Sequence, residues 1–242
     1  MCAGCVTRRG ILAAGVALMS SPARAGATVE PRFRCTPIAG RRRVALTLDA
    51  CGGGFDMRIA EALLAHRARA TIFATADWLR ANPGPLALLR AHPGLFGFEN
   101  HGAHHIPPVL GGGTLFGLRV AGTLAAVRQE VEGGAAAIRL ATGTAPRWYR
   151  GATARYSPAA LEEIARLGQG IAAYSLNGDE GASLPAAAVE RRVAAARDGE
   201  VVIAHINQPH RAAGAGLARA IAALAGQGVA WATLDELGPV LA

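Results

Sequence analysis

The chain has 242 residues and a formal net charge of +8, with 51% hydrophobic and 17% charged residues. This length fits a single α/β domain, and the apolar content excludes an intrinsically disordered chain. The 31 glycines follow no collagen-like period, and four cysteines are too few for a disulfide-dense scaffold of this length.

The positive charge has one tight cluster, Arg41-Arg42-Arg43, which directly precedes an apolar strand-like run. No aromatic residues that stack on bases are interleaved with it, so we interpret it as a solvated strand entry and expect no nucleic-acid partner. All 25 basic residues are arginine, so the charge reflects compositional bias as well as function. From the positive charge we expect only a modest attraction to anionic polymers.

The N-terminal segment 1–25 is typical of a twin-arginine export signal. Thr7-Arg8-Arg9-Gly10 precedes an apolar run from Ile11 to Met19, and Ala23-Arg24-Ala25 fits a small-x-small cleavage site. The alternative is a membrane anchor, but this run is too short to cross a hydrocarbon core of about 30 Å as a helix. We expect an exported protein, periplasmic or extracellular, with no membrane span and one catalytic domain over 26–242.

Cleavage after residue 25 would remove three arginines and no acids, so the net charge would fall from +8 to +5. Cys35 and Cys51 would remain in an oxidising compartment. There they form one disulfide or stay as two buried thiols, and the sequence leaves both alternatives open.

The remainder of the chain alternates strand-like and helix-like runs. Strands are predicted at 43–48, 70–74, 95–98, 147–149, 171–176, 200–204 and 229–233. Helices are predicted at 56–68, 85–91, 117–141, from Ser157 onward, at 185–197 and at 211–225, with a loop over 102–113. Repeated β-then-α units predict a parallel sheet or barrel with helices outside, and we find no repeat, linker or second domain.

Polar side chains follow five of these strands. They are Asp49, then His101 with His104 and His105, then Arg150, then Asn177 with Asp179, and last His205. Because the carboxyl ends of parallel strands meet at one edge, residues spread along the sequence are expected to converge in one pocket.

His101-Gly-Ala-His104-His105 is a candidate metal segment. Imidazoles four residues apart share a helical face or meet across a tight turn, and they can bind one divalent cation. Two histidines leave such a site incomplete, so a carboxylate or a third histidine must join them.

With these motifs the chain resembles the polysaccharide deacetylases, the NodB-homology group, over about residues 43–237. Thr47-Leu48-Asp49-Ala50 is similar to that family's Thr-Phe-Asp-Asp motif, and His101-x-x-x-His105 to its metal segment. Further matches are Arg150-Gly-Ala-Thr153 to Arg-x-Pro-Tyr, Leu176-Asn-Gly-Asp179 to the fourth, Asp-containing motif, and Ile203-Ala-His205 to Leu-x-His. The order and spacing agree, which is more specific than any single motif.

The resemblance implies a distorted (β/α) barrel of the NodB type and a hydrolase that removes acetyl groups from N-acetylated, or O-acetylated, glycans. It implies a divalent metal, with zinc expected, held by His101 and His105. Asp49 would be the general base, Arg150 would hold it ionised, His205 would be the general acid, and Asp179 would orient His205. Thr153 and Asn177 would contact the substrate.

The sequence departs from the family at two points. Ala50 stands where the family has a second Asp that binds the metal, so the third ligand would be Asp49, His104, Glu99 or Cys51. The third motif also lacks its Pro and Tyr.

These losses allow two other interpretations. One is a degenerate homologue that binds glycans without cleaving them, and the other is a metal-dependent amidohydrolase acting on a non-sugar C–N bond. The glycan hydrolase is favoured because its other expected site residues are present: Asp49, both histidines of the metal segment, Arg150 and His205.

Overall fold

The computed structural model describes residues 26–33, 40 and 42–236. The predicted export signal and Cys35 lie outside the described residues, so the signal stays a prediction. Cys51 is a free thiol in the structure, so of the two alternatives left open by the sequence, Cys51 follows the one without a disulfide. Across the described ranges, no helix has the length and apolar character needed to span a membrane.

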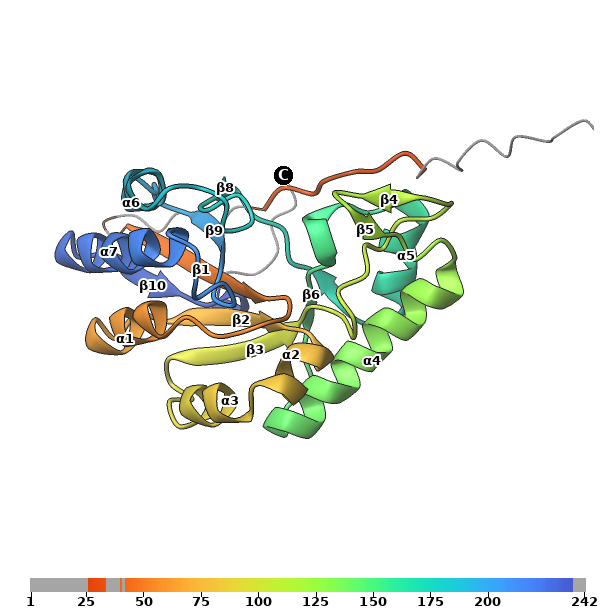
Figure 1. Cartoon of the computed structure of the whole chain (residues 1–242), viewed down its shortest axis with the longest axis horizontal. Coiled ribbons are helices and arrows are strands. Elements are labelled where there is room, and N and C mark those ends of the chain that lie inside the picture. Colours follow the sequence, from red (N-terminus) through yellow and green to blue (C-terminus); the bar gives the residue numbers. More distant parts are fainter. Residues whose placement is uncertain (1–25, 34–39, 41, 237–242) are drawn as a thin grey trace, which may run out of the picture.

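Eight parallel strands form one curled sheet with helices outside it (Figure 1). The order is β7 (Gly170–Ile171), β6 (Trp148–Tyr149), β3 (Phe96–Asn100), β2 (Ala70–Ala74), β1 (Arg43–Ala50), β9 (Glu200–His205) and β8 (Leu176–Asn177). β10 (Ala230–Ala232) pairs with the first half of β1, whose second half pairs with β2. This curled half-barrel confirms the predicted α/β barrel class.

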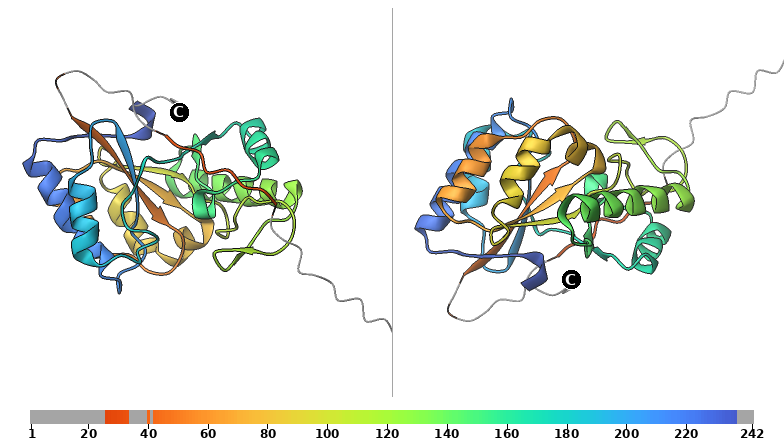
Figure 2. Two further views of the ribbon diagram at one scale, coloured as in Figure 1. Left: turned by 90° about the horizontal axis from the view of Figure 1, so that it is seen from above. Right: turned by 90° about the horizontal axis from the view of Figure 1, so that it is seen from below.

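The helices cover the outer face of the sheet. α1 (Met57–Ala65), α6 (Ala186–Ala194) and α7 (Ala213–Gly226) lie together beside β1 and β9 (Figures 1 and 2). α2 (Ala76–Ala81), α3 (Pro83–Arg90), α4 (Leu124–Thr142) and α5 (Pro158–Arg166) cover the remainder, from β3 to β7.

Strand alternation sorts the side chains of β1 between two environments. Val44, Leu46, Leu48 and Ala50 pack in the core beneath the helices. The intervening residues Ala45, Thr47 and Asp49 face the barrel interior, where a second apolar cluster contains Ala45 and side chains of β2 and β9. The buried polar side chains of β1, those of Thr47 and Asp49, therefore lie on its interior face.

The helix predicted over 117–141 begins instead at Leu124. Residues before it form a hairpin of β4 (Thr114–Leu115) and β5 (Leu118–Arg119). Its turn holds Gly117 at φ +80, a conformation that glycine adopts without strain. The Thr123 side chain then accepts the Ala126 amide and caps α4. The sequence prediction also missed α2.

The single strand predicted at 171–176 is two short strands that belong to opposite ends of the sheet. β7 pairs with β6, whereas β8 pairs with β9. The residues between them, Ala172, Ala173 and Tyr174, lie buried in the interior cluster. The carbonyls of Ala172 and Ala173 accept hydrogen bonds from the Arg150 side chain, and the backbone amide of Ala172 donates to the carbonyl of Tyr149.

Candidate active site

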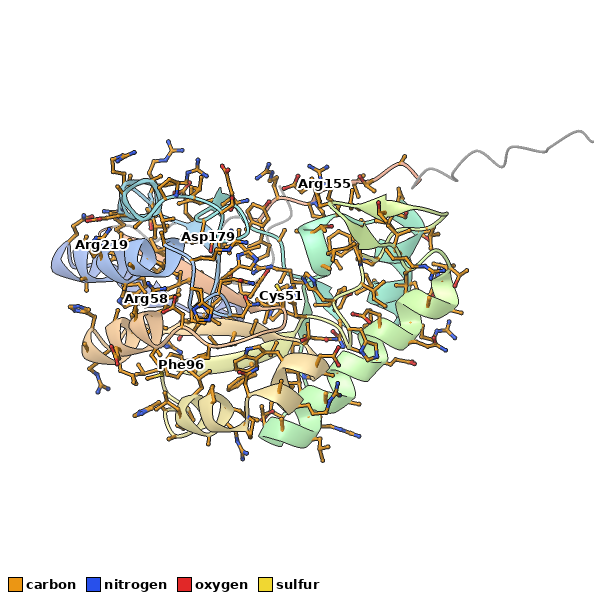
Figure 3. The ribbon with its side chains drawn as sticks, viewed as in Figure 1. Cys51, Arg58, Phe96, Arg155, Asp179 and Arg219 are labelled. Atoms are coloured by element: carbon orange, nitrogen blue, oxygen red, sulfur yellow. The ribbon has the colours of Figure 1, made fainter. Side chains whose placement is uncertain are left out.

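The side chains predicted from the strand ends converge at the carboxyl edge of the sheet. Asp49 and His205 are register partners on β1 and β9. β3 leads into His101, β6 into Arg150, and β8 into Asp179. Figure 3 shows Cys51 and Asp179, which follow β1 and β8, in this region.

Arg150 is a fully buried cation inside the barrel. Its Nη1 donates hydrogen bonds to Thr47 Oγ1 and to Asp49 Oδ1, both at 2.8 Å. Its Nε and Nη2 donate to the carbonyls of residues 172–173, at 3.1 and 3.3 Å. The guanidinium carbon lies 4.2 Å from the centre of the Phe73 ring. These contacts fix the guanidinium, and with it the carboxylate of Asp49.

Asp49 is held as a buried carboxylate. Burial alone would raise its pKa, but Arg150, His101 and His205 outweigh that effect and lower the pKa below its ordinary value. Its Oδ1 is bonded to Arg150, and its Oδ2 lies 3.7 Å from His101 Nε2. The second oxygen, Oδ2, is therefore directed toward His101, which with His105 forms the histidine cluster of the site.

His101 and His105 meet across a turn, and their ring centres are 4.9 Å apart. Gly102 at φ +90 and His105 at φ 59 turn the backbone in place of the helix that the spacing also allowed. The Nδ1 of His101 lies 2.7 Å from the carbonyl oxygen of Arg150, so that nitrogen carries the proton and donates. Its Nε2 is left facing the site.

Cys51 lies against the same histidines, with its Sγ 3.3 Å from His101 Nε2. Burial alone would raise the pKa of the thiol, but the neighbouring His101 lowers that pKa well below its ordinary value. One donor atom from each of Cys51, His101 and His105 lies within 4.8 Å of the others. Thiolate and imidazole ligands at this spacing suit a zinc-type ion.

The other ligands considered from the sequence lie elsewhere. His104 is exposed, and its Nδ1 is 3.1 Å from Asp77 Oδ2. Glu99 Oε2 accepts the backbone amides of Arg147 and Trp148. Both side chains are engaged away from the Cys51, His101 and His105 donors.

His205 and Asp179 form a tight pair. The Nδ1 of His205 is 2.9 Å from Asp179 Oδ1, and the backbone amide of His205 donates to Oδ2 at 2.7 Å. Burial alone would lower the pKa of His205, but the charge of Asp179 raises it well above the ordinary value. The pKa values of His205 and of its neighbour Asp49 are therefore shifted in opposite directions.

A cleft of about 630 Å³ opens onto these groups, and its lining includes Asp49, His105 and His205. Its walls also include residues that the sequence did not single out: Glu30, Arg32, Phe116, Arg155, Tyr174 and Glu180. Glu30 and Arg32 come from the N-terminal segment 26–33, which bridges to Tyr156 and to Tyr174 and contributes these two side chains to the lining. Figure 1 shows this segment as an extended stretch along the top of the view.

Thr153 and Asn177, predicted to contact substrate, both line this cleft. Thr153 has φ 69 and ψ −5, a left-handed conformation that is strained for a β-branched residue. Its buried Oγ1 has no hydrogen-bond partner. Asn177 Oδ1 accepts the amide of Glu180 at 2.9 Å, which shapes the loop leading to Asp179.

The sequence model of a family described as polysaccharide deacetylase matches residues 37–172. No match is found among the curated proteins.

Solved structures share the fold. BA3943 of Bacillus anthracis, described as a CE4 family pseudoenzyme, is 21% identical with TM-score 0.66, over 85% of this chain and 67% of that one. The peptidoglycan deacetylase PdaC from Bacillus subtilis is 19% identical with TM-score 0.65, over 82% of this chain and 90% of that one. A family 4 carbohydrate esterase from Streptomyces lividans, in complex with acetate, is 23% identical with TM-score 0.64, over 86% and 98%.

Replacing Arg150 tests whether the buried ion pair organises the site. Arg150→Met leaves the Asp49 carboxylate buried without its partner, so we expect the free energy of unfolding to fall by about 3–5 kcal/mol. Urea denaturation measures the loss. The double variant Asp49→Asn with Arg150→Met removes the stranded charge as well and should recover part of it.

The matched control is Arg155→Met, which removes a half-exposed partner of Glu30. It should change the free energy of unfolding by no more than about 1 kcal/mol. Equal losses in Arg150→Met and Arg155→Met would contradict the organising role of Arg150.

Proposed function

The chain belongs to the polysaccharide deacetylase family, and we propose that it is a metal-dependent hydrolase that removes acetyl groups from N-acetylated glycans. The observation that carries this proposal is the register pairing of Asp49 with His205 on neighbouring strands, with both side chains and His105 in the lining of one cleft. The pKa of Asp49 is lowered and that of His205 is raised, which agrees with this pairing. The predicted export signal supports action in the periplasm or outside the cell, on glycans of the envelope or surroundings.

Asp49 is the proposed general base. Its lowered pKa keeps the carboxylate ready to accept a proton from an attacking water. Arg150 holds Oδ1, which leaves Oδ2 as the oxygen directed toward the histidine cluster. The water would attack the carbonyl carbon of the acetamido group, and its proton would pass to Asp49.

His205 is the proposed general acid. Its raised pKa keeps the imidazole protonated, so it can give a proton to the amine as the C–N bond breaks. Asp179 fixes the ring through Nδ1, which directs Nε2 toward the substrate. Acetate and a free amino sugar are the products.

His101 and His105 are the proposed ligands of a divalent cation, expected to be zinc. When bound there, the cation supplies Lewis acidity to the carbonyl oxygen and to the attacking water. The proton on His101 Nδ1, donated to the Arg150 carbonyl, leaves Nε2 as the coordinating atom.

A second candidate function is glycan binding without cleavage. It is favoured by Ala50, which stands where the family motif has a metal-binding Asp. Among the structural neighbours, BA3943 is described as a pseudoenzyme, and a mutant of it as having restored enzymatic activity. An amidohydrolase acting on a non-sugar C–N bond would use the same base and acid.

Acetate release tests the enzyme directly. We expect the zinc-loaded protein to release acetate from N-acetylglucosamine oligomers or peptidoglycan, and Asp49→Asn to lower kcat about 10²–10⁴-fold, because the base is lost. The control is Asp77→Asn, which alters a carboxylate that pairs with Arg80 and His104 outside the cleft and should keep wild-type activity. Binding of a glycan without acetate release from any N- or O-acetylated glycan would establish the non-cleaving alternative.

Phe116 tests how the cleft holds the sugar chain. Its ring lines the cleft yet is 74% exposed, so it offers an apolar surface for a sugar ring. We expect Phe116→Ala to raise KM for glycan oligomers about fivefold and to leave kcat unchanged, because the ring binds ground and transition states equally.

The matched control for Phe116→Ala is Leu140→Ala, which removes another exposed apolar side chain, on α4 and outside the cleft lining. Its KM should match that of the wild type. An unchanged KM in Phe116→Ala, or a fall in kcat alone, would contradict a sugar-binding role for this ring.

A further inference from the structure

The third metal ligand is missing at the position where the family motif supplies it. Ala50 occupies that position, and its methyl group is fully buried in the core beneath the helices, together with Leu48. A methyl group has no lone pair, so position 50 contributes nothing to a metal. The ligand must come from another residue near the two histidines.

Cys51 stands close enough to the two histidines to fill this role. It directly follows the last residue of β1, and its donor atom lies within 4.8 Å of those of His101 and His105. Its Sγ is 3.3 Å from His101 Nε2. Tetrahedral zinc, with bonds of about 2.3 Å to sulfur and about 2.0 Å to nitrogen, places two such ligand atoms about 3.5 Å apart. The sulfur and the nitrogen are therefore already near bonding separation around one ion.

The neighbouring groups favour the same set of ligands. His101 Nδ1 is occupied by the Arg150 carbonyl, which directs the Nε2 lone pair toward Cys51. Asp49 Oδ1 is held by Arg150, and an Asp49 bound to metal would lose its use as a base. Cys51 itself is a free thiol in the structure. A sulfur ligand thus completes the site and leaves the carboxylate free.

We infer that Cys51, as a thiolate, is the third protein ligand of the metal, in a Cys-His-His set with His101 and His105. This inference rests on the proposed metal site and specifies its chemistry. Three protein ligands leave a fourth tetrahedral position for water or for the substrate carbonyl. The sulfur also selects zinc, cobalt or cadmium over magnesium, calcium and manganese, which prefer oxygen ligands.

Cobalt substitution tests the sulfur bond by a readout separate from activity. The purified protein loaded with one equivalent of Co²⁺ should show the near-ultraviolet charge-transfer band of a thiolate–cobalt bond. Cys51→Ser should lose this band. Cys35→Ser, which changes the other cysteine of the predicted mature chain, should keep it.

A second variant guards against a folding defect. Cys51→Asp replaces the sulfur by a carboxylate oxygen, so it should bind one cobalt by metal analysis and show no charge-transfer band. A band that persists in Cys51→Ser, or one bound cobalt without a band in the wild type, would overturn the role of Cys51. Failure of the proposed function is distinct: the band would be present, but the zinc-loaded protein would release no acetate.

Discussion

The ion pair between Arg150 and Asp49, buried inside the barrel, fixes the geometry of the site. Arg150 is fully enclosed, and a cation without partners there would be strongly destabilising. Its hydrogen bonds go to Thr47 and Asp49 on β1 and to the carbonyls of residues 172–173, which lie between β7 and β8. One side chain therefore orients the base and ties the first strand to the segment that crosses the interior.

The parallel sheet supplies the other half of the arrangement. Alternation along β1 sends Ala50 toward the helices and Asp49 toward the interior, and Cys51 follows directly after the strand, against His101. The register of β1 with β9 then places His205 next to Asp49. An acid and a base with pKa values shifted in opposite directions stand side by side because two strands pair in one register.

The sequence predicted the features that depend on short-range patterns. Alternating β and α runs implied the parallel sheet, and polar residues after strands located Asp49, Arg150 and His205 at one edge. It did not predict contacts set by distant parts of the chain. The segment 26–33 contributes to the cleft and bridges to Tyr156 and Tyr174. The strand predicted at 171–176 divides because its two ends pair with different strands, β6 and β9, and its middle crosses the interior, where the carbonyls of residues 172–173 accept hydrogen bonds from Arg150. Nothing in the sequence indicated that Phe116 lines the cleft, because it appears there only as a single aromatic residue in a glycine-rich stretch.

A crystal structure of the zinc-loaded protein with a bound N-acetylglucosamine oligomer would show the metal ligands and the orientation of the substrate together. Anomalous scattering at the zinc edge should give one peak within bonding distance of His101 Nε2, His105 and Cys51 Sγ. The acetamido carbonyl should point at that peak, between Asp49 and His205. Zinc bound at other residues would contradict the proposed metal site. An acetamido group directed away from Asp49 and His205 would contradict their proposed roles as base and acid.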